Sequence, residues 1–204
     1  MYRPTAGRIV VDGTDLSELA VTAWRERLSA TFQDFQRLHF TLAHSVGTGD
    51  LPRIDEPEPV RAALARAGSH SLEEQLPDGL ETRIGNRFTG GRELSGGQWQ
   101  RLALARGLMR EGPLLVVLDE PTASLDAPTE SALFARYTSA ARALADAYGT
   151  ITLLVSHRFS TVRTADLIVV LENGLVREAG SHQELMAAGG TYAELFELQA
   201  RAYG

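Results

Sequence analysis

The fold of this chain is decided by the stretch from residue 93 to residue 126, which reads ELSGGQWQRLALARGLMREGPLLVVLDEPTASLD. The stretch opens with a glycine-rich turn. Ser95 is a favourable N-cap residue for a helix, and Gly96 and Gly97 let backbone N–H groups approach an anion closely. Apolar residues then recur at helical spacing, which predicts a helix that buries one face: Leu102, Ala105, Leu108 and Met109.

An apolar strand that ends in two carboxylates follows this helix. Residues 114–118 are apolar without alternation, which is typical of a central parallel strand buried on both faces. Asp119 and Glu120 come directly after it. Because open α/β sheets bind ligands at the carboxyl ends of their strands, we expect both carboxylates to lie in a ligand site.

These motifs resemble those of one protein family. Residues 94–98 match the LSGGQ signature of ABC proteins, and residues 114–120 resemble a Walker B strand followed by the ABC catalytic glutamate. The two motifs together, in this order, are highly specific. The resemblance covers the whole chain and implies an α/β fold: a P-loop NTPase (RecA-like) ABC ATPase core with an inserted α-helical subdomain.

Length and composition fit one domain, or one domain with a subdomain, because 204 residues can bury a sizeable core. The net charge of −6 offers no basic patch for nucleic acid, so we expect no nucleic-acid partner. The absence of cysteine excludes disulfides and thiolate metal sites. No apolar run approaches the roughly 20 residues that span a bilayer, and the first residues do not resemble a signal peptide. These features are typical of a soluble cytosolic domain.

One motif of the family is missing, because all 20 basic residues are arginine and none is lysine. A P-loop (Walker A motif) needs Gly-x-x-x-x-Gly-Lys-Ser/Thr, whose lysine neutralises the β- and γ-phosphates and whose hydroxyl ligates magnesium. Residues 2–13 resemble the segment that follows the Walker A helix in ABC proteins. We therefore expect an ABC nucleotide-binding domain that is incomplete at the N-terminus, without its first strands, its base-stacking aromatic residue and its P-loop.

The resemblance divides the chain into two parts. Residues 1–34 and 111–204 would form the truncated ATPase core, and residues 35–110 the helical subdomain that carries the signature. Two departures from the family pattern precede the signature: Asn86 stands where many members have glutamate, and the insert at residues 87–92 lengthens the usual spacing. Because of these two departures, the resemblance does not extend to the coupling contacts that family members make in this segment.

Three further motifs follow the family order. Gln33, after an expected strand at residues 28–32, matches the Q-loop glutamine. Residues 124–126 match the D-loop, where Asp126 also fits a helix N-cap. His157 follows an expected buried strand at residues 151–155 and matches the H-loop histidine. The other histidines have no such placement, and we interpret them as structural or solvated.

The family implies a role for each residue in hydrolysis of ATP with Mg²⁺. Asp119 would hold magnesium, and Gln33 would contact both magnesium and the attacking water. Glu120 would act as the general base and His157 would contact the γ-phosphate, so the expected catalytic residues are Glu120, His157 and Gln33.

A second set of residues would bind nucleotide across a dimer. The family architecture implies that Ser95, Gly96, Gly97 and Gln98 face the γ-phosphate held by a second nucleotide-binding domain, in a homo- or heterodimer. Asp126 belongs to the same nucleotide-binding set.

The C-terminal part resembles exporter-type cassettes, which are normally fused behind six transmembrane helices; the similarity lies in residues 180–185 and 192–195. We therefore expect an ATPase that powers export at the cytoplasmic face of the cell membrane, held there by transmembrane domains. Two alternatives stay open. One is a catalytically incompetent fragment without a P-loop, although intact Glu120 and His157 argue against long decay. The other is a soluble non-transport ABC ATPase, although its usual coiled-coil insertion or paired cassette with a basic linker is absent. The transported substrate does not follow from this sequence.

Overall fold

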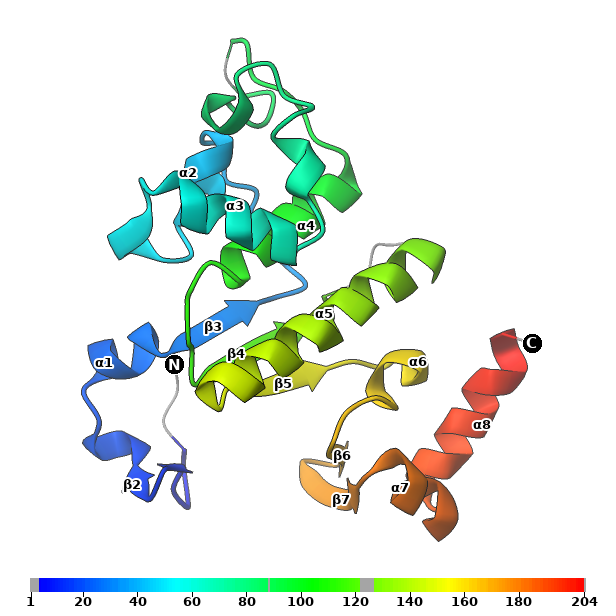
Figure 1. Ribbon diagram of the computed structural model, residues 1–204. Coiled ribbons are helices and arrows are strands. Elements are labelled where there is room, and N and C mark those ends of the chain that lie inside the picture. Colours follow the sequence, from blue (N-terminus) through cyan, green and yellow to red (C-terminus); the bar gives the residue numbers. More distant parts are fainter. Residues whose placement is uncertain (1–3, 88, 122–126, 204) are drawn as a thin grey trace.

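The computed structural model describes residues 4–87, 89–121 and 127–203 (Figure 1). The strands are β1 (Val10–Val11), β2 (Thr14–Asp15), β3 (Leu28–Thr31), β4 (Leu115–Asp119), β5 (Ile151–Val155), β6 (Ile168–Glu172) and β7 (Leu175–Gly180). The α-helices are α1 (Val21–Glu26), α2 (Leu42–Gly47), α3 (Pro57–Arg66), α4 (Gly96–Gly107), α5 (Ala127–Tyr148), α6 (Phe159–Val162), α7 (His182–Ala188) and α8 (Thr191–Tyr203). Short 3-10 turns lie at η1 (Leu16–Glu18), η2 (Leu51–Arg53), η3 (His70–Leu72) and η4 (Gly79–Glu81).

A parallel sheet with the order β3-β4-β5 forms the centre of the molecule. Its register places Leu28 opposite Leu115, and Leu115 opposite Ile151. The strand predicted to be central is therefore paired on both edges, and Val116 and Leu118 of β4 are buried. The prediction of a central parallel strand is confirmed.

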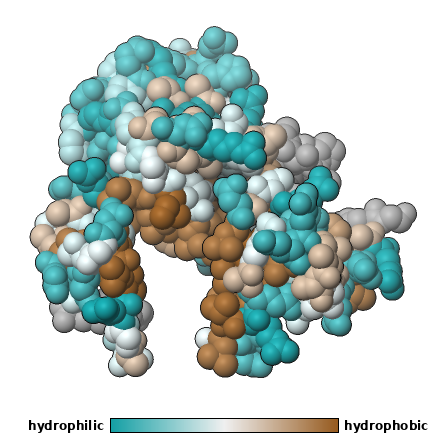
Figure 2. All heavy atoms as spheres, turned by 60° about the horizontal axis from the view of Figure 1, so that its bottom comes forward, coloured by the Kyte–Doolittle hydropathy of each residue, from teal (hydrophilic) through white to brown (hydrophobic). Residues whose placement is uncertain are grey.

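The second strand predicted to be buried is not buried. Ile151, Leu153 and Val155 of β5 are 68%, 52% and 48% exposed. Among the described residues β5 pairs with β4 alone, so one of its edges has no strand beside it. An apolar run indicates that a strand can be buried, but burial depends on what packs beside it. Figure 2 shows apolar surface on both sides of an open notch in the molecule.

Helices α2, α3 and α4 pack together above β3 (Figure 1). The helix predicted after the glycine-rich turn is α4, and its expected face is buried through Leu102 and Ala105. The same hydrophobic core continues into the sheet, where it includes Val116 and Leu118 of β4, and into α5, where it includes Tyr137. The division at residues 34/35 and 110/111 therefore stays a prediction, since one core joins the two parts.

An antiparallel hairpin, β6-β7, and the helices α7 and α8 complete the chain. Asn173 and Gly174 form a dipeptide that predicts a two-residue hairpin turn from sequence. Both have positive φ, at 51° and 77°, as such a turn requires. No helix in the described residues is both long enough and apolar enough to cross a membrane.

The contact between the end of α2 and the end of α4 gives a first testable prediction. A Cβ atom added at Gly49 would lie 1.9 Å from the carbonyl oxygen of Arg106 and 2.9 Å from Cβ of Met109. Because one of these atoms is helix backbone, we expect Gly49→Ala to lower the free energy of unfolding by about 3 kcal/mol. Urea denaturation followed by circular dichroism measures the loss.

Gly149→Ala is the control for this prediction, because the added methyl group at that position meets nothing within 4 Å. Gly149 has a φ of 69°, so the control still carries backbone strain of about 1 kcal/mol. Equal losses for the two variants would contradict the close approach at Gly49.

Candidate active site

The carboxyl ends of β4 and β5 bring two of the predicted catalytic side chains together. Asp119 is the last residue of β4 and pairs with Val155, the last residue of β5. The N–H of Glu120 donates to the carbonyl of Val155 over 3.0 Å, which extends the pairing by one residue. His157 follows β5 directly, and its Nδ1 lies 3.1 Å from Oε1 of Glu120. Parallel pairing therefore turns two residues 37 positions apart into neighbours.

The backbone at Glu120 is strained. Its φ is 43°, in the left-handed region that costs a non-glycine residue about 1–2 kcal/mol. Two contacts hold this conformation: the bond from Glu120 N–H to β5, and a bond from the Gln100 side chain on α4 to the carbonyl of Pro121. Such strain is common at catalytic positions, where the fold fixes the direction of a side chain.

The sequence interpretation missed Gln100. This side chain lies within the buried face of α4, where Gln100 is only 6% exposed. A polar residue among buried helix positions is the signal that could have identified it, because buried amides need hydrogen-bond partners. The partner, Pro121, is 21 residues away and follows Glu120 directly.

The Glu120–His157 pair is suited to proton transfer at an open edge. The side chains of Glu120 and His157 are 27% and 65% exposed, so water reaches both. A carboxylate accepts a hydrogen bond from an imidazole N–H and can still accept a proton from water with its other oxygen. The pair is also an ion pair whenever the imidazole is protonated.

Asp119 and Gln33 are the predicted metal ligands. Gln33 lies in the turn after β3, whose residue Thr31 pairs with Leu118 next to Asp119. Both therefore belong to the same edge of the sheet as Glu120. Among the described residues no group of three or more His, Asp or Glu side chains could hold a metal ion by itself. Magnesium suits such a sparse site, because it is usually held by one or two carboxylates, phosphate oxygens and water.

The signature residues form the N-terminus of α4. Ser95 Oγ accepts from the N–H of Gln98 over 3.2 Å, and Gln98 Oε1 accepts from the N–H of Ser95 over 2.8 Å. The predicted N-cap is thus confirmed as a capping box. Ser95 and Gly96 are exposed, and a Cβ added at Gly96 would meet nothing within 4 Å.

The structure does not bring the signature to the carboxylate–histidine pair. Within the described part of the chain no hydrogen bond or ion pair joins Ser95 or Gln98 to Glu120 or His157. Asp126 and the rest of the predicted D-loop lie outside the described residues. The roles predicted for these residues stay predictions.

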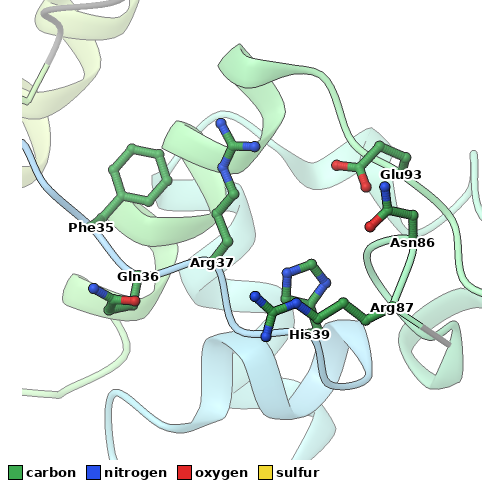
Figure 3. A pocket seen from close by; sticks show the side chains of 7 residues that line it. All are labelled: Phe35, Gln36, Arg37, His39, Asn86, Arg87 and Glu93. Carbon is green, nitrogen blue, oxygen red and sulfur yellow. The ribbon is translucent and has the colours of Figure 1, made fainter.

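A pocket of about 540 Å³ lies between the segment after Gln33 and the loop ahead of the signature (Figure 3). Its lining is mostly polar and comprises Phe35, Gln36, Arg37, His39, Asn86, Arg87 and Glu93. The buried side chain of Trp99 contacts this lining. Its Nε1 donates to Glu93 over 2.9 Å, and this hydrogen bond lowers the pKa of Glu93. Asn86, which departs from the family pattern, is part of this lining.

The parallel sheet with a glutamate and a histidine at its carboxyl edge, and a capped signature helix beside it, define the class of protein as an ABC-type ATPase domain of P-loop NTPase fold. Comparison with known proteins gives the family. The chain belongs to the ABC transporter family, whose model matches residues 1–123.

Individual relatives agree with this family. The chain is 42% identical over 200 residues to an ATP-dependent lipid A-core flippase of Ralstonia nicotianae, covering 97% of this chain and 32% of the relative. A protein of the same description from Thiobacillus denitrificans is 39% identical over 198 residues, covering 97% of this chain and 32% of that relative. A solved structure of a bacterial Atm1-family ABC exporter with ATP bound matches with a TM-score of 0.83 and 34% identity, covering 98% of this chain and 33% of the exporter. The chain spans about a third of the length of these proteins.

Proposed function

We propose that this chain is part of the ATP-binding and ATP-hydrolysing domain of an ABC exporter, and that this domain powers substrate translocation across a membrane. The observation that carries the proposal is the 3.1 Å contact between Glu120 and His157 at the carboxyl ends of adjacent parallel strands. The fold and the exporter relatives support the same assignment.

In the proposed reaction, Glu120 accepts a proton from the water that attacks the γ-phosphate. His157 holds the carboxylate through Nδ1 and contacts the γ-phosphate. Gln33 positions the attacking water, and Asp119 and Gln33 are the side chains that would hold Mg²⁺. When bound, Mg²⁺ would neutralise charge on the β- and γ-phosphates.

The proposed partners are a second nucleotide-binding domain and transmembrane domains. The exposed N-terminus of α4 presents backbone N–H groups that favour an anion. In the described residues no hydrogen bond joins Ser95 or Gln98 to Glu120. We propose that Ser95, Gly96, Gly97 and Gln98 complete the site of a second nucleotide-binding domain. Transmembrane domains would hold the dimer at the membrane and would select the substrate, so the lipid A-core named for some relatives is not assigned to this chain.

The absence of a P-loop gives a second testable prediction. We expect a polypeptide of these 204 residues to show no saturable MgATP binding in the low micromolar range and no hydrolysis. A P-loop supplies a nest of backbone N–H groups, a lysine and a hydroxyl for phosphate recognition. Asp119 and Glu120 would instead repel a nucleotide with several negative charges. Calorimetric titration together with a phosphate-release assay makes the measurement.

A fusion protein tests the proposed function itself. A strand, P-loop and helix from an ABC exporter are fused to the N-terminus of this chain. The added strand can then pair with the edge of β5 that has no strand beside it in the described residues. We expect the fusion to bind and hydrolyse MgATP, and the same fusion with Glu120→Gln to bind without hydrolysis. Turnover by the 204-residue chain alone, lost in its Glu120→Gln variant, would overturn the prediction that phosphate capture needs a P-loop. A fusion that binds MgATP without hydrolysing it would overturn the proposed function.

A further inference from the structure

One side chain of the C-terminal helix contacts the backbone on both sides of Arg158. Oε1 of Gln199, on α8, accepts a hydrogen bond from the N–H of Phe159 over 2.9 Å. Its Nε2 donates to the carbonyl oxygen of His157 over 3.4 Å, a longer and weaker bond. The Gln199 amide therefore binds the segment that carries His157 of the candidate active site, which lies 42 residues away in the sequence.

The bond from Phe159 to Gln199 supplies a helix cap that the local sequence does not. Helix α6 begins at Phe159, and the side chain of its N-cap residue, Arg158, makes no capping hydrogen bond. Gln199 provides the acceptor for the first N–H of α6 in place of a local cap. An amide side chain carries a neutral acceptor and a donor on the same carbon, so Gln199 can hold the N–H of Phe159 and the carbonyl of His157 at the same time.

Helix α8, which carries Gln199, contacts both β7 and α6. Both oxygens of Glu178, on β7, accept from the first turn of α8, at 2.6 Å from the N–H of Thr191 and 3.1 Å from that of Tyr192. The ring of Phe159 packs edge-on against α8, with ring centroids 5.3 Å from Tyr192 and 5.7 Å from Phe196. These contacts hold the first turn of α8 to β7 and to the segment that begins α6.

We propose that Gln199 is a positioning residue for ATP hydrolysis, which fixes the backbone at His157 so that the imidazole stays in contact with Glu120. Gln199 acts through His157 and touches no reacting atom. This inference rests on the proposed function of the Glu120–His157 pair. It makes α8 part of the catalytic machinery, although α8 contributes no side chain to the site.

The experiment compares ATP turnover of an assembled transporter that contains this chain with turnover of its variants. Gln199→Met keeps length but removes both hydrogen bonds, and we expect kcat to fall about tenfold at unchanged KM for ATP, because a misplaced group lowers the chemical step. Gln199→Glu keeps the acceptor for Phe159 N–H, so it should recover part of the loss. Gln183→Met makes the same chemical change at an exposed position of α7 and should leave kcat unchanged.

A double variant separates positioning from general stability. If Gln199 acts through His157, then Gln199→Met should cause no further loss of kcat in a His157→Ala background. Thermal unfolding of every variant checks that each is folded, and Gln199→Glu serves as the test should Gln199→Met not fold.

The possible failures have different causes. Wild-type kcat in Gln199→Met, or an equal tenfold loss in the His157→Ala background, overturns the positioning role and leaves the proposed function intact. Wild-type turnover in His157→Ala alone overturns the role of His157 in the proposed function, and this inference with it.

Discussion

Glu120→Gln lowers ATP turnover of a transporter that contains this domain by about 10²–10⁴-fold, the contribution expected of a general base. The amide matches the carboxylate in size, and its oxygen can still accept the bond from Nδ1 of His157. It cannot accept a proton from water at neutral pH. The structure thus predicts a loss of chemistry with little change in geometry, because glutamine meets the same backbone strain as Glu120.

Nucleotide binding separates this effect from misfolding. The Glu120→Gln transporter should bind MgATP as tightly as the wild type, measured by calorimetric titration, while phosphate release falls. Glu74→Gln, at an exposed position of the helical region, is the matched control and should change neither quantity. Normal hydrolysis by Glu120→Gln would falsify the role given to this carboxylate.

Ser95→Arg should abolish hydrolysis in the same assembly, because a bulky cation would stand where the signature approaches the second domain's γ-phosphate. The substitution also breaks the capping box of α4, which costs about 1 kcal/mol of stability. Phosphate release by the homodimeric variant measures the first effect and thermal unfolding the second. A mixed dimer should lose the one site that is built with the altered signature.

The chain contains a matched control for the lost cap. Ser181 starts α7 with the same reciprocal arrangement, in which its hydroxyl accepts from Glu184 N–H and the Glu184 side chain accepts from Ser181 N–H. Ser181→Arg should therefore cost a similar stability and leave hydrolysis intact. Full turnover by the Ser95→Arg homodimer would rule out a site composed of two domains.

The sequence predicted those parts of the fold whose cause is local. The N-cap at Ser95 and the turn at Asn173 and Gly174 depend on residues within three positions of one another, and both are as expected. The central position of β4 was also predictable, because a continuous apolar run is typical of a parallel strand buried on both faces. Asp119 and Glu120 then had to lie at the carboxyl edge, since the strand ends there.

The prediction that β5 is buried was wrong, because burial depends on segments that are distant in the sequence. The residues of β5 form a largely apolar run like that of β4, yet Ile151, Leu153 and Val155 are each about half exposed or more exposed than that, at 48% to 68%. The difference is one of neighbours: β4 is paired on both edges, and β5 on one within the described residues. An apolar pattern indicates that a strand can be buried, whereas its exposure depends on what packs against it.

The sequence by itself determined the family, the order of the motifs and the identity of the catalytic candidates, because these are properties of residue types at fixed spacings. Tertiary structure alone decided how the candidates are held. The backbone at Glu120 is left-handed, a property that no local motif indicated. The Gln100 bond behind it and the Gln199 bonds to the histidine segment join residues 21 to 42 positions apart. Such contacts depend on how the sheet and the helices pack, because no local pattern specifies which distant amide will meet which carbonyl.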